Sequence, residues 1–244
     1  MVSKLIDAHF HLDFYKNHKD IYDEINRLQQ YTICMTNSPG VFLSCKKMYA
    51  ETKYLKFALG LHPQETGNIY ANLGDFEKYF DMTNYIGEIG LDFGKKNLLT
   101  KDVQIKNLKR ILNMAHGTNK VISLHIRNAE KETLEILTKY DCSKTIIHWY
   151  GGQSNELQEF VNLGCYFSIN TNMVNNSSML GKLFVIPQNR ILIESDGPFT
   201  KVQGRVYKPN LLKQAYQSVG KALEIEELDK EVYRNFRNLL VEGV

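Results

Sequence analysis

Short apolar segments rich in β-branched residues recur along this chain, and each is followed by a stretch with apolar residues at helical spacing. Near-continuous apolar runs of this kind are typical of parallel strands covered on both faces. The alternation therefore predicts a parallel sheet with helices outside it. The eight expected strands are residues 4–12, 31–38, 55–63, 84–92, 120–126, 144–150, 165–171 and 190–196.

The stretches between these segments predict amphipathic helices. In residues 19–30, Ile21, Ile25 and Leu28 form one apolar stripe. Gly164 is a typical helix stop directly before the next strand. Further helices are expected at residues 101–116, 155–164 and 228–244.

Eight strand–helix units within 244 residues predict closure of the sheet into a (β/α)8 TIM-like barrel. No linker or low-complexity tract divides the sequence, so residues 1–244 are expected to form a single domain. The hydrophobic content of 43% is sufficient for one sizeable core.

Charge, cysteine usage and hydropathy narrow the class of protein. The net charge of +3 does not by itself require a nucleic-acid partner, but it leaves the surface without strong repulsion toward phosphates. The cysteines have no paired spacing and are expected to be free thiols in a reducing compartment: Cys34, Cys45, Cys142 and Cys165. No apolar run is long enough for a membrane span or a signal peptide, so a soluble cytoplasmic protein is expected.

The first strand contains two histidines close together, in "DAHFHLD" at residues 7–13. Alternate side chains of a strand share a face, so Asp7, His9 and His11 would point the same way. Taken alone, this pattern fits a solvated strand end as well as it fits a cation site.

Polar residues of this kind lie at the ends of most of the predicted strands, the first one included. They are His9, His11, His62, Glu88, His125, His148 and Asp196. Five of the seven histidines lie at such positions, and strand ends of a barrel converge on one mouth. The set predicts a site for two divalent cations bridged by one carboxylate, whereas a structural cluster of ion pairs is the alternative. Imidazole and carboxylate ligands favour Zn²⁺, Mn²⁺ or Fe²⁺, while Mg²⁺ usually takes more oxygen ligands.

The other two histidines are expected to be structural. His18 lies in a predicted polar loop and would be solvated, and His116 ends a predicted helix, where a cationic ring suits the helix dipole.

The motifs around these residues resemble the TatD family of metal-dependent deoxyribonucleases. They run in order along nearly the whole chain: "IDAHFHLD", "GLHPQ" (60–64), "GEIGLDF" (87–93), "ISLHIRNA" (122–129), "IIHWYGG" (146–152) and "RILIESDGPF" (190–199). The resemblance implies a barrel of the metallo-dependent hydrolase type.

The resemblance also implies roles for individual residues. His9, His11 and Asp196 would hold one metal, and His125 with His148 would hold a second. Glu88 would bridge the two metals, and Asp196 would also orient or deprotonate the attacking water. His62 is similar to the substrate-contacting histidine of the family, with a hydrogen-bonded loop histidine as the alternative.

The chain departs from the usual family pattern after the sixth and eighth strands. It has "WYGG" at residues 149–152, "SDGPF" at residues 195–199 and "GRVYKP" at residues 204–209. Together with "GLHPQ", "HW" and "GCYFSIN", these segments resemble the TatD-like subunit of Qat-type anti-phage defence operons. That resemblance implies a defence role with operon-encoded partners.

Loop residues near the strand ends are candidates for binding DNA. Arg127, Arg205 and Lys208 could contact phosphates. Trp149 and Tyr150 could stack on an unpaired base, with barrel packing and a rim position as the respective alternatives. Lys95 and Lys96 are expected in a solvated loop. Because no broad basic stripe is present, single strands or accessible ends are favoured over long duplexes.

Three further acidic residues lie close to the predicted ligands in the sequence. Asp7 is expected to hold a ligand imidazole by its second nitrogen, and Asp92 is expected to act similarly. Glu194 shares the inward direction of Asp196, and a barrel-filling ion pair is its favoured interpretation.

Three functions fit this sequence. The first is a metal-dependent phosphodiesterase acting on DNA. The second is a hydrolase of another bond, such as an amide, lactone or aminoacyl ester. Many barrels of this architecture have a carboxylated lysine as the bridge on the fourth strand, and Glu88 at that place favours the first function. The third is a non-catalytic subunit of a defence complex, which the complete set of ligands disfavours.

Overall fold

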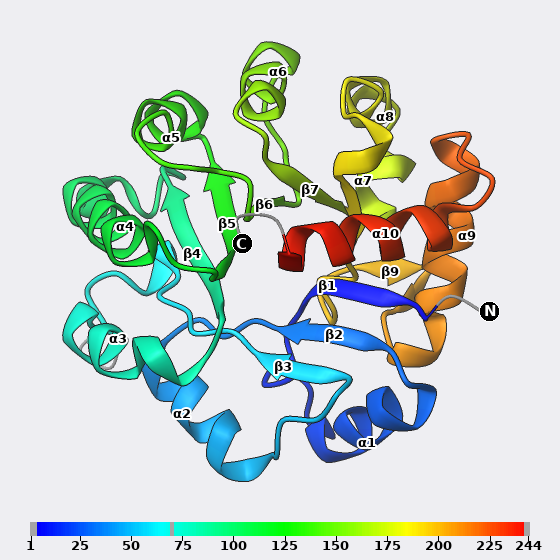
Figure 1. The fold of residues 1–244 in the computed structure, drawn as a ribbon, viewed down its shortest axis with the longest axis horizontal. Helices are drawn as coiled ribbons and strands as arrows, with labels where there is room; N and C mark the ends of the chain where they lie inside the picture. The colour runs from blue at the N-terminus through cyan, green and yellow to red at the C-terminus, as the bar shows by residue number, and fades with distance from the viewer. Residues whose placement is uncertain (1–3, 69–70, 242–244) are drawn as a thin grey trace.

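A computed structural model describes residues 4–68 and 71–241. Its eight main strands are parallel, as the sequence predicts: β1 (Ile6–Phe10), β2 (Tyr31–Cys34), β3 (Leu55–Phe57), β4 (Tyr85–Asp92), β5 (Val121–Arg127), β6 (Thr145–His148), β7 (Tyr166–Ile169) and β8 (Ile191–Ile193). Every segment expected to be a strand overlaps one of them, and β5 extends one residue beyond its predicted end. Figure 1 shows them at the centre of a ring of helices.

Backbone hydrogen bonds close the strands into a barrel. Leu59 donates to the carbonyl of Tyr85, which joins the end of β3 to β4. The backbone N–H of Asp196 donates to the carbonyl of His9 at 2.9 Å, and the backbone N–H of His11 donates to the carbonyl of Gly197 at 3.0 Å. The predicted TIM-like barrel is therefore confirmed, and the second junction lies within the predicted metal-binding segments.

The helices form the outer layer: α1 (His18–Leu28), α2 (Pro39–Met48), α3 (Leu73–Tyr79), α4 (Lys101–Ala115), α5 (Glu130–Leu137), α6 (Ser154–Asn162), α7 (Thr171–Asn175), α8 (Ser177–Leu183), α9 (Leu212–Ala222) and α10 (Leu228–Val241). All four helices expected from sequence are present, although residues 242–244 of the last one lie outside the described residues. Ile21 and Ile25 bury the apolar stripe of α1. Gly164 has a positive φ of 84° just after α6, as a helix stop requires.

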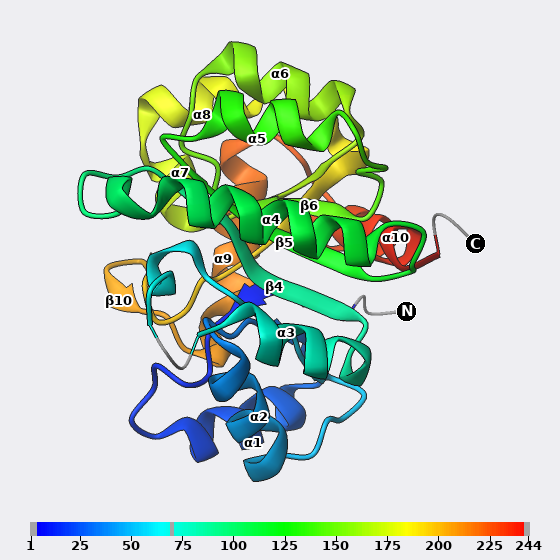
Figure 2. The same ribbon diagram turned by 90° about the vertical axis from the view of Figure 1, so that its left-hand side faces the viewer.

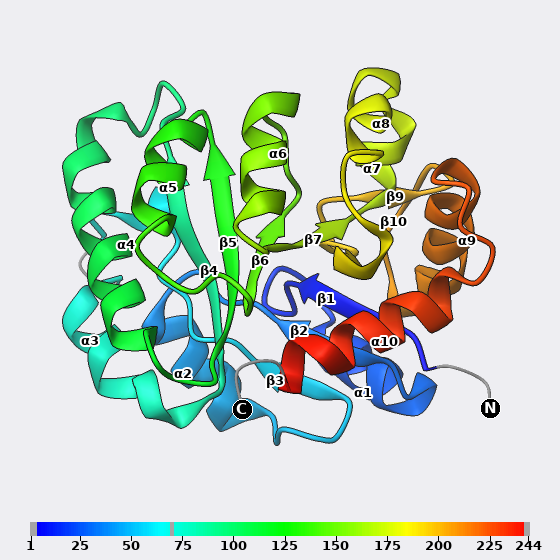
Figure 3. The same cartoon turned by 45° about the horizontal axis from the view of Figure 1, so that its top comes forward.

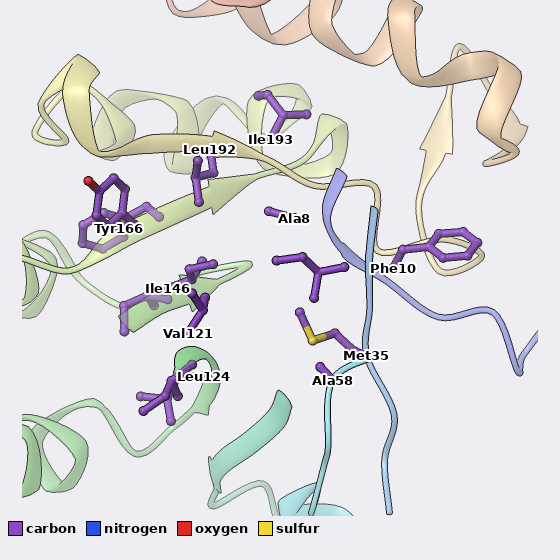
Figure 4. Packing of buried hydrophobic residues seen from close by; sticks show 14 of the residues in the cluster. Ala8, Phe10, Met35, Ala58, Val121, Leu124, Ile146, Tyr166, Leu192 and Ile193 are labelled. Atoms are coloured by element: carbon purple, nitrogen blue, oxygen red, sulfur yellow. The ribbon is translucent and has the colours of Figure 1, made fainter. Parts of the chain in front are cut away.

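Side chains alternate between the barrel interior and the helix layer. In Figure 4, Leu192 of β8 points toward the neighbouring strands, and Ile193 points to the opposite side. Because every second side chain of a strand lies on the same face, Glu194 lies with Leu192 on the inner face of the barrel. Buried apolar residues fill both layers.

The two ends of the barrel differ. Helix α10 crosses the end where the strands begin (Figures 1 and 3), and its buried Asn235 donates to the carbonyls of Gln188 and Ile191. The opposite end carries the loops that follow the strands, including a hairpin of β9 (Lys201–Val202) and β10 (Arg205–Val206) that projects on the left of Figure 2. Strand–helix loops of a barrel carry its chemistry, so this end is the one to search for a site.

Other structural expectations have mixed outcomes. All four cysteines are buried free thiols, as predicted. In the described part of the chain, no helix has the length and apolar character needed to cross a membrane. His116 directly follows α4, as expected. The prediction for His18 is wrong, because it begins α1, is half-buried and is hydrogen-bonded through Nδ1 to the Tyr49 hydroxyl.

Candidate metal centre

The strand ends bring the polar residues singled out from sequence into one cluster. His9, Glu88, His125 and His148 lie on β1, β4, β5 and β6, while His11 and Asp196 lie just beyond β1 and β8. All six are buried except His125, which is partly exposed.

One half of the cluster is formed by the ends of β1 and β8. Nε2 of His9 lies 3.1 Å from Nε2 of His11. Oδ1 of Asp196 lies 3.7 and 3.4 Å from these two nitrogens. The three residues therefore direct one ligand atom each toward a common point.

The other half gathers around Glu88. Its Oε1 lies 2.7 Å from Nδ1 of His125 and 3.3 Å from Nε2 of both His148 and His62. Its Oε2 faces the first half instead, at 3.4 and 3.3 Å from Nε2 of His9 and His11. A carboxylate whose two oxygens face two separate nitrogen groups has the arrangement of a bridging ligand.

The atoms at the centre of the cluster fit divalent cations. The two facing Nε2 atoms of His9 and His11 can share only one proton, so one of them presents a lone pair to the other. The rings of His9 and His148 also stack at 3.7 Å, which disfavours charge on both. A cation in each half would receive the converging lone pairs and neutralise the two buried carboxylates.

The electrostatics of the cluster are those of strongly coupled buried groups. Burial alone would raise the pKa of Glu88, but the facing rings of His62 and His148 outweigh it and hold that pKa well below its usual value. Burial raises the pKa of Asp196 to about 7 despite the opposing effect of His148 and His11. Burial and the neighbouring His148 lower the pKa of His9 to about 3. His9 is therefore neutral at pH 7, as a metal ligand must be.

Glu194 fixes the orientation of His148 from behind. Nδ1 of His148 is hydrogen-bonded to Oε2 of Glu194 at 3.1 Å. Ser168 donates to the same oxygen, and Asn170 donates to Oε1 at 2.8 Å. The expected ion pair is present, but its partner is a candidate metal ligand, so Glu194 also positions the centre. The sequence reasoning missed this role, although the spacing to Asp196 indicated the inward direction.

The predicted contact between Asp7 and a ligand imidazole is wrong. The carboxylate of Asp7 accepts hydrogen bonds from the backbone N–H and the hydroxyl of Ser195, at 2.8 and 2.5 Å. His9 Nδ1 is instead hydrogen-bonded to the Ser123 hydroxyl at 2.9 Å. The register between β1 and β2 shifts after Asp7, so simple alternation fails there. Asp7 supports the segment that carries Asp196.

Asp92 lies behind His125, as expected from sequence. Its Oδ2 is 3.5 Å from Nε2 of His125 and accepts a 2.6 Å hydrogen bond from the side chain of Gln64. Burial would raise the pKa of Asp92, but hydrogen bonds from His125, Gln64 and Gly94 lower it strongly. The carboxylate thus stays charged beside the outer nitrogen of His125.

His62 has the polarity of a hydrogen-bond donor toward the centre. Its Nδ1 accepts a hydrogen bond from the backbone N–H of Gln64 at 3.2 Å. A neutral ring in this state carries its proton on Nε2, which faces Glu88. Such a nitrogen can donate to a phosphate oxygen but offers no lone pair to a metal.

The candidate DNA contacts are placed unevenly. Arg127 and Arg205 are exposed, at the end of β5 and in the β9–β10 hairpin, and Trp149 is half-buried beside His148. Tyr150 is 1% exposed and donates its hydroxyl hydrogen to the carbonyl of Gln153, so its predicted stacking role and its rim alternative are both wrong. Lys208, Lys95 and Lys96 are exposed as expected.

Two phenylalanines next to the site were not singled out from sequence. Phe14 and Phe199 follow the first and last ligand segments, and their rings contact that of His11. The signal was an apolar aromatic residue directly after each polar ligand motif, in a segment expected to be a loop.

Known proteins are similar to this chain over most of its length. A family model described as "TatD related DNase" matches residues 6–241. An uncharacterised metal-dependent hydrolase of Buchnera aphidicola is 26% identical over 96% of this chain and 98% of its own length. The human deoxyribonuclease TATDN3 is 26% identical over 80% of this chain and 78% of its own length.

Solved structures share the fold. The TatD homologue YjjV of Escherichia coli superposes with a TM-score of 0.78, at 21% identity and with 98% of each chain covered. An uncharacterised amidohydrolase of Saccharomyces cerevisiae superposes with a TM-score of 0.79, at 14% identity, covering 97% of this chain and 99% of its own.

Proposed function

The chain belongs to the TatD-related DNase family, and on that premise we propose that it hydrolyses phosphodiester bonds of DNA with two divalent cations. The observation that carries the proposal is the position of Glu88, whose two oxygens face two separate groups of buried imidazoles. His9, His11 and Asp196 would hold one cation and His125 with His148 the other. Zn²⁺ and Mn²⁺ suit this nitrogen-rich set better than Mg²⁺.

When bound, such a cation pair lowers the pKa of a coordinated water and stabilises charge on the phosphate. The side chains of the chain itself supply the remaining steps. Asp196 accepts a proton from the attacking water as the water oxygen bonds to phosphorus. His62 donates from Nε2 to a phosphate oxygen and orients it. The bond from phosphorus to the leaving sugar oxygen breaks, and that oxygen takes a proton from solvent.

We further propose that the substrate is a single strand or an accessible end, and that cleavage is of the exonuclease type. Exposed cations such as Arg127 and Arg205 lie on separate loops that follow different strands, which suits a short contact better than a long duplex. Residues 1–244 would act as one hydrolase domain in the cytoplasm.

The test is to incubate labelled single-stranded and blunt duplex DNA with the purified protein and Mn²⁺, Zn²⁺ or Mg²⁺. We expect metal-dependent nucleotide release by the parent and almost none by Glu88→Ala. Equal release by both proteins would indicate a contaminating nuclease and contradict the proposal. Hydrolysis of aminoacyl esters, lactones or amides, without DNA cleavage, would assign the same centre to another bond.

A role in anti-phage defence with operon-encoded partners is a separate proposal, supported by the resemblance of "GLHPQ", "GCYFSIN" and "SDGPF" to the TatD-like subunit of Qat-type systems. Phage plating on cells that carry the whole operon tests it. The Glu88→Ala variant should abolish protection if hydrolysis is required. Unchanged protection in that variant would assign the chain a non-catalytic role there.

A further inference from the structure

Two phenylalanine rings project beside the metal centre. Phe14 is 46% exposed and Phe199 is 49% exposed, although neighbouring aromatic residues are buried. Their centroids lie 5.5 and 5.6 Å from that of His11 and 4.9 Å from each other. The two rings meet edge to face, at 68°. An apolar surface thus begins directly at a candidate metal ligand.

The backbone beneath these rings is well supported. Phe199 donates its N–H to the carbonyl of Asp196 at 2.8 Å. A Cβ at Gly197 would lie 2.4 Å from the Tyr207 ring and 2.5 Å from the Tyr15 hydroxyl, so the loop lies directly on buried aromatic residues. Tyr15 in turn donates to the carbonyl of Tyr207. The loop that carries Phe199 is therefore supported from below, as a binding surface requires.

The charges on the loops that carry these rings suit a partner that combines an aromatic ring with phosphates. Exposed basic residues lie on the same two loops: Lys16, Lys201, Arg205 and Lys208. None of them forms an ion pair within residues 4–68 and 71–241. Asp13, next to Phe14, is an acidic residue among them. An apolar protein surface would match the two rings but not these cations.

We propose that Phe14 and Phe199 form a stacking platform for an unpaired nucleobase next to the phosphate being cleaved. This inference rests on the proposed function and defines its substrate class as DNA with unpaired bases at the cleaved position. A paired base is stacked inside the duplex, so its faces are not available to the two rings. Tyr150 is buried and cannot share this role.

Kinetics on defined oligonucleotides test the platform. Base stacking on aromatic residues is strong enough that Phe14→Ala combined with Phe199→Ala should raise KM for a single strand about tenfold or more. With Phe199 unchanged, the Phe14→Tyr variant should keep most of the affinity of the parent for the single strand, whereas the Phe14→Leu variant should not. Phe184→Ala is the matched control, because Phe184 is a 56% exposed phenylalanine that follows α8, in the crossover toward β8.

Removing the bases from the substrate completes the design. On an oligonucleotide with abasic terminal positions, the KM of the parent should rise by the same factor. The KM of the double variant should be the same on the abasic and the intact oligonucleotide. Cation binding, measured by calorimetry on each variant, shows that the metal centre is intact. An unchanged KM in the double variant, with DNA still cleaved by the parent, would overturn the platform alone. Absence of cleavage by the parent would overturn the proposed function and the platform together.

Discussion

Glu194 and Glu88 contact opposite nitrogens of the same ring: Nδ1 of His148 lies 3.1 Å from Glu194, and Nε2 lies 3.3 Å from Glu88. Burial alone would lower the pKa of His148, but the two carboxylates outweigh it and hold that pKa well above its usual value. A carboxylate behind a ligating imidazole fixes its tautomer and raises its basicity toward a metal. The inner carboxylate and the ring would bind the cation together, while the outer carboxylate keeps the ring in place.

Glu194→Gln should therefore weaken cation binding without unfolding the protein. The amide keeps the size of the side chain but removes its charge, so we expect a loss of about 10- to 100-fold in metal affinity or in kcat/KM. Calorimetric titration with Mn²⁺ or Zn²⁺ measures the affinity. Glu159→Gln, an exposed carboxylate on α6, is the control and should behave like the parent. Parent-like affinity in Glu194→Gln would mean that this contact is only structural.

Metal affinity should fall as the pH is lowered below 7. In the metal-free protein, burial raises the pKa of Asp196 to about 7. The bound form requires the Asp196 carboxylate without its proton, so affinity weakens as pH drops through that pKa. His148, whose pKa is also raised, must lose its proton as well, which weakens binding further at low pH. The slope is about tenfold per pH unit for each proton displaced. Calorimetry between about pH 6 and pH 8, in buffers of different ionisation enthalpy, counts the protons released. A cation affinity that does not change with pH would contradict this coupling of cation binding to proton release.

Much of the fold follows from local patterns in the sequence. Each of the eight expected strands is present because a buried parallel strand is apolar on both faces, as in "TIIHWY" at residues 145–150. The ends of such strands meet at one mouth in a closed barrel. The positions of the strand ends in the sequence are therefore sufficient to predict that His9, Glu88 and His148 lie together.

The wrong or missing sequence predictions concern residues whose positions depend on tertiary contacts rather than on local patterns. Asp7 accepts a hydrogen bond from Ser195, 188 residues later in the chain, and no local periodicity could indicate this contact. Tyr150 follows a ligand histidine as Trp149 does, yet it is buried, because its hydroxyl finds a partner at Gln153. The surface formed by Phe14 and Phe199 depends on the junction of β1 and β8, which are far apart in the sequence.

His62 offers a test that separates substrate contacts from metal ligands. Because its Nδ1 accepts from Gln64, its Nε2 carries a proton in the neutral ring and would donate to the substrate. His62→Gln should bind cations with the affinity of the parent and lose about 100-fold in kcat/KM on DNA. His148→Ala is the comparison and should lose cation binding itself. Weakened cation binding in His62→Gln would instead make His62 a ligand.

The far end of the barrel should control stability but not catalysis. Asn235 of α10 is fully buried, and its Nδ2 donates to the carbonyls of Gln188 and Ile191 at 2.7 and 2.8 Å. Asn235→Leu leaves both carbonyls without these partners, which should lower the free energy of unfolding by about 2–4 kcal/mol. Urea unfolding measures this loss. Metal-dependent activity per folded molecule should match that of the parent, because the centre lies at the opposite end.

The neighbouring Arg234→Ala is the control for this prediction. Arg234 is exposed and pairs with Glu231 one helical turn away, an interaction that contributes about 0.3–0.5 kcal/mol. Its removal should barely change the urea midpoint. If both variants lost the same stability, the effect would come from helix propensity rather than from the contact with β8. The difference between the two variants therefore measures how strongly α10 holds the end of the barrel where the strands begin.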